Sequence, residues 1–181
     1  MDLGLKGKVA LVGGASKGLG RACALELAQE GASVSLCSRD GAAAAAAAGE
    51  IAAATGSPAA GFGFDLSRGG DPEAWVKASA ARFGDADILV HNTGGPPPGE
   101  FDDLEEVDWR QAFDLLVLSA VRLYRAVIPG MRQRQWGRIV AIESISVKEP
   151  IDGLLLSNAL RPAVVALNKS LSRRLAADGV I

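Results

Sequence analysis

The stretch that decides the fold lies near the start of the chain and reads Val9-Ala10-Leu11-Val12-Gly13-Gly14-Ala15-Ser16-Lys17-Gly18-Leu19-Gly20. Its first four residues predict a buried parallel strand, because a strand covered on both faces lacks polar alternation. A helical pattern follows over residues 21–30 and stops at Gly31. Glycines at this joint let backbone N–H groups approach a phosphate at a helix N-terminus. We therefore predict a nucleotide-binding loop that contains Gly14, Ser16, Lys17, Gly18, Leu19 and Gly20.

Strand and helix patterns alternate along the rest of the chain. Further strands are expected at residues 33–37, 59–64, 87–90 and 137–143, and further helices at 41–55, 105–131 and 153–177, with another that begins at Asp71. Such alternation predicts a parallel sheet with helices on both faces, and right-handed crossovers favour the strand order 3-2-1-4-5. The predicted fold class is α/β, a doubly wound Rossmann-like sheet in a single domain over residues 1–181.

Two of the expected helices have unusual sequences. Seven consecutive alanines, Ala42 to Ala48, give the helix at residues 41–55 no amphipathic stripe, so we expect it on the protein surface. In the helix at residues 105–131, Pro129 and Gly130 are expected to loosen the C-terminal end.

Composition excludes several classes of protein. The 181 residues include 19 basic and 21 acidic ones, so no strong field favours nucleic acid or an anionic membrane. No apolar run approaches the ~20 residues of a membrane helix, and the N-terminus does not resemble a secretory signal. The two cysteines, Cys23 and Cys37, are expected to be reduced thiols in a cytoplasmic protein. His91 is the single histidine, which argues against a metal site.

Motifs along the whole chain resemble the short-chain dehydrogenase/reductase family, and within it the 3-oxoacyl-acyl-carrier-protein reductase-like group. The motifs are residues 13–20, Phe64-Asp65-Leu66, His91-Asn92-Thr93-Gly94-Gly95, residues 137–144 and residues 157–180. The resemblance implies that Asp65 and Leu66 lie by the adenine of a dinucleotide cofactor, and Asn92, Thr93 and Gly94 along it. His91 and Thr93 are mild departures from the family's usual Asn-Asn-Ala-Gly.

The residues after the second expected strand bear on the choice of cofactor. NAD sites commonly place an acid there to bind the ribose 2′-hydroxyl, whereas NADP sites place a cation. Here the position of the acid is Ser38, Arg39 follows, and Lys17 adds a second cation on the same side. A guanidinium matches phosphate geometry. We therefore predict NADP(H), the alternative being that Arg39 merely pairs with Asp40 or Asp65.

The family resemblance also implies hydride transfer between nicotinamide and a small carbonyl or alcohol substrate. Ser144 matches the family serine, whereas Ser157 and Arg161 stand where the family has its tyrosine and lysine, and Leu116 stands where it has an asparagine. Arg161 can hydrogen-bond the ribose hydroxyls but cannot shuttle a proton, because it stays protonated. Ser144 and Ser157 could hydrogen-bond a carbonyl oxygen. The alternatives are a helix-surface or first-turn serine at 157 and a salt bridge at Arg161.

These departures keep a second reading open, a non-catalytic NADP(H)-binding protein that acts as a sensor or assembly partner. A third reading is a hydrolase, because Gly14-Ala15-Ser16-Lys17-Gly18 formally matches G-x-S-x-G. It would need His91 as its base and Asp65 to orient that base.

Two further expectations follow from the resemblance. Family members associate through the long and last helices, so we expect a homo-oligomer, a dimer or tetramer. Its apolar interface could be formed by Leu115, Leu118, Leu123, Leu167 and Leu171. The alternative is that these leucines face the sheet. The family begins its sixth strand near Gly179, so the domain is expected to be truncated, with its C-terminal strands and roughly 70 residues missing.

Overall fold

The computed structural model describes residues 3–181, and its five strands form one sheet. The strands are β1 (Val9–Val12), β2 (Ser33–Ser38), β3 (Ala59–Gly63), β4 (Ile88–His91) and β5 (Arg138–Ala141). Their order is β3-β2-β1-β4-β5, and each neighbouring pair is parallel. The predicted α/β, doubly wound Rossmann-like sheet of order 3-2-1-4-5 is therefore confirmed.

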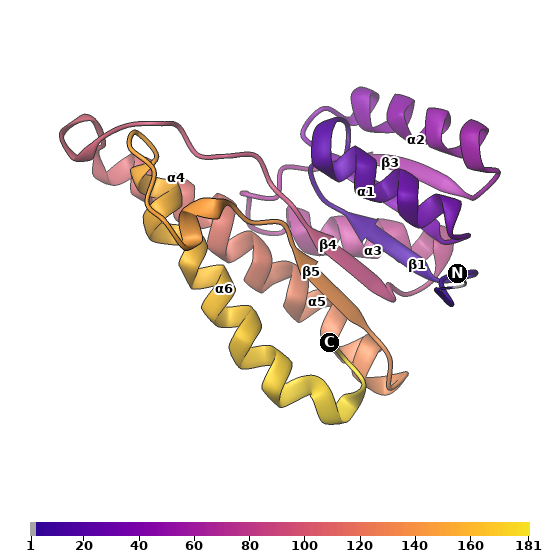
Figure 1. The fold of residues 1–181 in the computed structure, drawn as a ribbon. Helices are drawn as coiled ribbons and strands as arrows, with labels where there is room; N and C mark the ends of the chain where they lie inside the picture. Colours follow the sequence, from indigo (N-terminus) through magenta and orange to yellow (C-terminus); the bar gives the residue numbers. More distant parts are fainter. Residues whose placement is uncertain (1–2) are drawn as a thin grey trace.

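Helices cover both faces of the sheet (Figure 1). On one face lie α1 (Gly18–Gln29) and α2 (Gly41–Thr55), and on the other lie α3 (Asp71–Phe83), α5 (Ser119–Gln133) and α6 (Leu155–Leu175). The strand order reverses between β1 and β4, and ligands of open α/β sheets bind beside the carboxyl ends of strands at such a point. The topology therefore places a candidate site above β1, β2 and β4.

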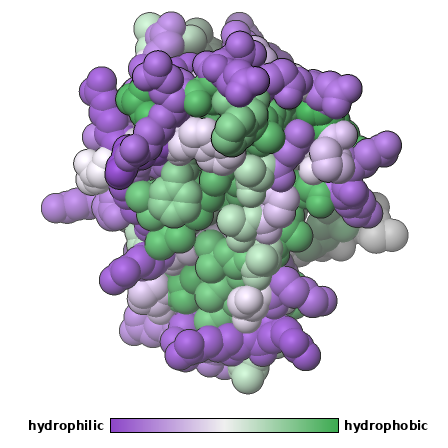
Figure 2. Space-filling view, turned by 90° about the vertical axis from the view of Figure 1, so that its left-hand side faces the viewer, coloured by the Kyte–Doolittle hydropathy of each residue, from purple (hydrophilic) through white to green (hydrophobic). Residues whose placement is uncertain are grey.

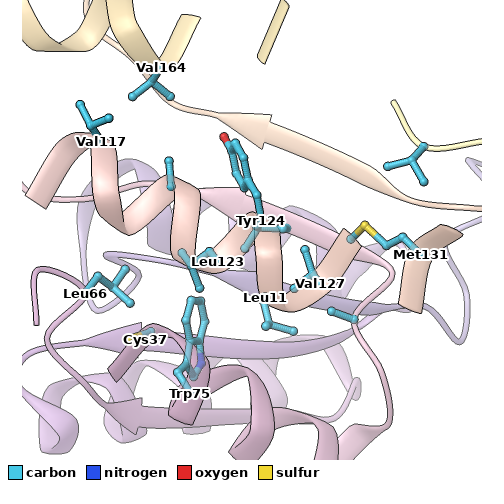
Figure 3. Close-up of a cluster of buried hydrophobic side chains, with 14 of the residues drawn as sticks. Leu11, Cys37, Leu66, Trp75, Val117, Leu123, Tyr124, Val127, Met131 and Val164 are labelled. Carbon is cyan, nitrogen blue, oxygen red and sulfur yellow. The ribbon is translucent and has the colours of Figure 1, made fainter. Parts of the chain in front are cut away.

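The sheet separates two hydrophobic cores. The core under α3, α5 and α6 contains Trp75, Leu123 and Tyr124, all 2% exposed or less (Figure 3). Leu123 thus packs inside the molecule and takes no part in the expected apolar interface. The core under α1 and α2 is built from smaller side chains, among them Val34 and Ala48. Both cores fix the helices that carry the residues around the carboxyl ends of the strands.

The alanine-rich helix α2 agrees only in part with the sequence-based expectation. It lies in the outer layer, but Ala44, Ala47 and Ala48 are buried together with Ile51. Small side chains let this helix pack closely on β2 and β3, so the alanines form a contact face even though they give no hydrophobic stripe. The helix therefore lies on the surface as expected, and what the sequence did not show is that its alanines form a buried contact face.

The long helix expected at residues 105–131 is divided into three segments. They are α4 (Glu106–Phe113), the π-helical segment η2 (Asp114–Leu118) and α5. Pro129 lies inside α5, which continues to Gln133, two residues beyond the expected end at residue 131, so the helix is not interrupted at the proline. The last helix ends at Leu175 and is followed by the 3-10 turn η4 (Ala176–Asp178).

Residues 179–181 run beside β5. The backbone N–H of Ile139 donates to the carbonyl oxygen of Ile181 at 2.8 Å, and the N–H of Ile181 donates to Gly137 at 3.0 Å. The bridge between Gly137 and Val180 is parallel. The last described residues therefore occupy the position of a further parallel strand next to β5. Within residues 3–181, no helix is long and apolar enough to span a membrane.

Candidate functional site

The glycine loop between β1 and α1 needs its glycines for two separate reasons. Gly14 and Gly18 have φ values of 56° and 59°, in the left-handed region that side chains with a Cβ rarely adopt. Gly20 is buried, and a Cβ added there would lie 2.5 Å from the carbonyl oxygen of Gly14 and 2.8 Å from that of Gly13. The loop therefore packs against the start of α1 through Gly20. The side of the loop that faces away from α1 stays exposed.

Asn92, which follows β4, fastens this loop to the sheet. Its side-chain amide donates to the carbonyl oxygens of Gly13 and Gly14 at 3.0 and 3.4 Å. The N–H of Gly13 in turn donates to Val90 at 3.0 Å. The glycine loop and the end of β4 thus form one rigid unit at the point where the strand order reverses.

A cleft of about 650 Å³ opens beside this unit. Its lining includes ten of the residues predicted from the sequence to contact a cofactor: Gly14, Ser16, Lys17, Ser38, Arg39, Asp65, Leu66, Asn92, Thr93 and Gly94. The sequence analysis did not assign a cofactor contact to the other lining residues: Cys37, Asp40, Ala43, Phe64, Gly95 and Leu115. Phe64 directly follows β3, and Cys37, Asp40 and Gly95 lie within a few residues of the end of a strand, which was the signal that could have found these four.

Three residues of the predicted loop are absent from the cleft lining. Gly18 and Leu19 begin α1, and the Leu19 side chain is 68% exposed. Gly20 is buried against the loop backbone. These three residues shape the turn, whereas Gly14, Ser16 and Lys17 face the cleft.

Two cations at the cleft, Lys17 and Arg39, form no salt bridge among the described residues, although the charge of Arg39 acts on Asp65. Both side chains are exposed. The carboxylate of Asp40 instead accepts the N–H of Ala43 and caps α2 at 3.0 Å. Arg39 therefore does not form the surface ion pair that was the alternative to phosphate binding.

Asp65 stays ionised at the far side of the cleft. Partial burial alone would raise the pKa of this carboxyl, but hydrogen bonds from Ser67 and the charges of Arg39 and Arg68 hold the pKa below its usual value. The Ser67 hydroxyl and N–H donate to Asp65 Oδ1 at 2.7 and 3.0 Å. The cleft lining consequently contains two carboxylates, Asp40 and Asp65, and two cations, Lys17 and Arg39.

The three predicted catalytic residues lie beyond the ends of β5 and at the start of α6. The Ser144 hydroxyl oxygen accepts the N–H of Ser146 at 3.1 Å, which leaves its own proton free to be donated. Ser157 is the third residue of α6 and is 7% exposed, so it is a first-turn serine but not a surface one. Arg161 follows one helical turn later. None of the three is among the residues that line the 650 Å³ cleft.

Arg161 has a partner that the sequence analysis did not assign. Its Nη1 donates to Glu143 Oε2 at 3.0 Å, and the two side chains are only 11% and 12% exposed. Burial raises the pKa of Glu143, although the Arg161 charge opposes this shift. The salt bridge named as the alternative role of Arg161 is therefore present. A glutamate directly before Ser144, at the end of an apolar strand, was the signal that could have predicted it.

His91 lies beneath these residues. Its Nε2 is 2.9 Å from the Ser119 hydroxyl, and the ring makes an edge contact with Tyr124, with centroids 6.1 Å apart. Burial first, and then the Arg161 charge, lowers the pKa of His91 to about 4. Within residues 3–181, no hydrogen bond joins His91 to Ser16 or Asp65, so the arrangement that a hydrolase would need is not formed.

The loops that leave β4 and β5 are fastened to each other. The N–H of Gly99 donates to Gly153 at 2.8 Å, and the N–H of Gly153 donates to the Glu100 carboxylate at 2.6 Å. The Asn158 side chain bonds the N–H and carbonyl of Ile151 at 3.2 and 2.9 Å. These loops lie on the left of Figure 1. Figure 2 shows the molecule from that side, with hydrophobic residues gathered in the middle and hydrophilic ones around them.

The described residues contain no cluster of three or more histidine, cysteine or acidic side chains that could hold a metal ion. Cys23 and Cys37 are both free thiols, and burial raises the pKa of Cys37 to about 12, so this thiol stays protonated. The chemistry of the site therefore depends on the cleft, its cations and the polar side chains near Ser144.

Comparisons with known proteins agree with this geometry. The family model described as short chain dehydrogenase matches residues 8–181. The uncharacterized oxidoreductase YvrD of Bacillus subtilis is 31% identical over 178 residues, which cover 95% of this chain and 64% of YvrD. The 3-oxoacyl-acyl-carrier-protein reductase FabG of Vibrio cholerae is 33% identical over 180 residues, covering 98% of this chain and 71% of FabG.

Among solved structures, L-sorbose reductase from Gluconobacter frateurii, in complex with NADPH and L-sorbose, superposes with a TM-score of 0.95. Its sequence is 32% identical, and the match covers 99% of this chain and 68% of the reductase. The chain thus spans between 64% and 71% of the length of these relatives.

Proposed function

This chain belongs to the short-chain dehydrogenase family, and from that premise we propose that it binds NADP(H) and acts as an oxidoreductase on a small carbonyl or alcohol substrate. The observation that carries the proposal is a pair of exposed cations, Lys17 and Arg39, that form no salt bridge within residues 3–181 and lie at one end of a 650 Å³ cleft. A 2′-phosphate is the group of NADP(H) that such a pair would hold.

The residues present fit a dinucleotide. A pyrophosphate would lie beside the N-terminus of α1, where backbone N–H groups favour an anion. Gly14 lets the loop pack against β4, because a Cβ there would meet the Asn92 amide nitrogen at 2.7 Å. Ser38 and Arg39 lie where a ribose and its 2′-phosphate would be held, and Asp65 and Leu66 would contact the adenine. Asn92, Thr93 and Gly94 would lie along the cofactor. The L-sorbose reductase of similar fold was solved with NADPH, which supports the same choice.

When bound, the nicotinamide would supply or accept the hydride. The residues of this chain would orient the substrate and manage the proton. Ser144 has a free hydroxyl proton to donate to a carbonyl oxygen, and Ser157 lies on the same side of α6 as Arg161. Arg161 cannot release a proton, so the proton would come from water through the serine hydroxyls. The likeness to FabG favours a 3-oxoacyl thioester as the class of substrate.

A second candidate function is NADP(H) binding without turnover. Leu116 cannot take part in a hydrogen-bonded proton path, and it is 1% exposed in the core. Ser157 is a far weaker acid than a phenol. Arg161 is already bonded to Glu143. These three features would suit a sensor or an assembly partner that holds the cofactor.

One pair of measurements separates the candidates. NADPH is titrated against the protein by fluorescence, and NADPH oxidation is then followed with ketones, aldehydes and a 3-oxoacyl thioester. Substrate-dependent oxidation that is lost in Ser144→Ala supports the enzyme. Binding without oxidation supports the non-catalytic protein, and failure of NADPH to bind contradicts both.

We further propose that the chain forms one domain and associates into a dimer or tetramer through α5 and α6. A groove of about 440 Å³ between these helices is lined by apolar side chains that include Val121, Ile128, Leu167 and Leu171. A cytoplasmic location is proposed from the two free cysteines. Sedimentation of the purified chain measures the oligomeric state.

A further inference from the structure

The sheet face under α5 and α6 carries a buried ion pair just beyond β5. The Glu143 and Arg161 side chains are 12% and 11% exposed and meet at 3.0 Å. A pair at this depth is costly to break, because removal of one partner leaves an uncompensated charge away from water. The pair therefore holds the Arg161 guanidinium at one place, although arginine is a flexible side chain.

The register of the sheet explains why Glu143 reaches Arg161. His91 pairs with Ala141, and the N–H of Ile142 donates to the His91 carbonyl oxygen at 2.9 Å, so the chain after β5 remains extended along β4. Side chains two residues apart on an extended chain point to the same face. Glu143 and Ala141 therefore face the layer that contains α6.

His91 and Tyr124, which lie near the ion pair, add no charge to it at neutral pH. The Ser119 hydroxyl donates to the Leu115 carbonyl oxygen at 2.5 Å, so it accepts the proton that His91 carries on Nε2. Nδ1 of His91 is left without a hydrogen-bond partner among the described residues, in a side chain that is 2% exposed. Burial keeps His91 and Tyr124 neutral, with pKa values of about 4 and about 12. The charges of Glu143 and Arg161 therefore cancel without a contribution from either ring.

We propose that Glu143 is a positioning residue that fixes Arg161 and cancels its charge. The inference rests on the proposed function, because Arg161 lies outside the cleft lining and it is the family's lysine position that would bring it beside the nicotinamide of the bound cofactor. The nicotinamide ring is cationic in NADP⁺ and neutral in NADPH. A lone guanidinium at this place would repel the oxidised ring, whereas the neutral pair does not discriminate between the two forms. The residue before Ser144 would thus set the balance between oxidised and reduced cofactor.

The test compares dissociation constants for NADP⁺ and NADPH, measured by calorimetry, in the wild type and in two isosteric variants. Glu143→Gln leaves a net positive charge, so the ratio of the NADP⁺ constant to the NADPH constant should rise by about three- to tenfold. Arg161→Gln removes the cation that lowers the pKa of Glu143, so this variant and the wild type are compared at pH 8.5, where the ionised carboxylate leaves a net negative charge and the same ratio should fall by a similar factor. Asp178→Asn, which removes the Arg132–Asp178 ion pair elsewhere, should leave the ratio unchanged.

Opposite shifts in the two variants support the proposal, because a merely structural role would weaken both cofactor forms alike. An unchanged ratio, or shifts in the same direction, overturns it. The double variant Glu143→Gln/Arg161→Gln has no net charge and should keep the wild-type ratio. Circular dichroism shows whether each variant is folded, and if one single variant is unfolded, the ratio in the other single variant and in the double variant tests the proposal. If the wild type binds neither form, the proposed function itself fails, which is a distinct result.

Discussion

Gly61 of β3 lies directly against the backbone of Ala44 in α2. A Cβ added at Gly61 would overlap the carbonyl group of Ala44 and the amide nitrogen of Ala45. The contact joins the edge strand to the helix that packs over it, beside the end of the cleft where Ser38 and Ala43 lie. The close approach therefore fixes the position of α2 relative to the sheet, beside the end of the cleft where the proposed 2′-phosphate site lies.

Gly61→Ala is expected to destabilise the protein by about 2–3 kcal/mol, because either α2 or β3 must move to make room for the methyl group. The measurement is urea unfolding followed by circular dichroism. Gly49→Ala is the matched control on α2, since a Cβ there meets nothing within 4 Å. The control should gain about 0.5–1 kcal/mol, because glycine weakens a helix. Equal effects of the two substitutions would contradict the close packing.

Asn92→Ala should loosen the glycine loop. It removes the donor for the carbonyl oxygens of Gly13 and Gly14, and we expect a loss of about 1–3 kcal/mol in unfolding free energy. NADPH affinity should fall as well, because the loop is no longer held against β4. Thr93→Ala removes only a local bond to Gly94, so its unfolding free energy should change by less than about 0.5 kcal/mol. A stability loss in Thr93→Ala as large as in Asn92→Ala would argue against this role of the amide.

Lys17→Ala and Arg39→Ala test the cations of the cleft. Each should weaken NADPH binding about 10- to 100-fold and leave NADH binding nearly unchanged, because only NADPH carries the 2′-phosphate. Fluorescence titration of both cofactors gives the ratio directly. Arg21→Ala is the control, since Arg21 pairs with Glu50 at 2.7 Å and does not line the cleft. An equal loss of affinity for NADPH and NADH would show that the two cations do not bind the 2′-phosphate.

The sheet could be predicted from the sequence because each strand is a short apolar run between turn-forming residues. The order of the strands followed from the right-handed crossover rule, which depends on no particular side chain. The glycine loop was predictable for a similar reason, since glycine at a strand–helix joint has few other uses. These features depend on local sequence alone.

Other features arise only when distant segments meet. The Glu143–Arg161 pair joins residues 18 positions apart, one just after β5 and the other on α6. The buried face of the alanine helix depends on Gly61 of another element. The π-helical segment at Asp114–Leu118 has no distinctive composition. Sequence periodicity cannot show which polar side chains become buried partners. The sequence therefore indicated a possible salt bridge of Arg161 but not that Glu143 is its partner.

His91→Asn tests the pH dependence of stability. The folded-state pKa of His91 is about 4, below its ordinary value of 6.5, so the unfolded chain binds a proton between these values while the folded one does not. The stability contributed by neutral His91 is thus complete above pH 6.5 and is lost as the pH falls toward 4, by about 1.4 kcal/mol per pH unit. Asparagine cannot titrate, so the variant should lose stability less steeply than the wild type over this range. Urea unfolding of both proteins at pH 7, 6 and 5 measures the difference, and other titrating groups cancel in the comparison. Parallel losses would mean that His91 binds its proton equally in the folded and unfolded protein, so that it would carry a charge near the Glu143–Arg161 pair below about pH 6.5.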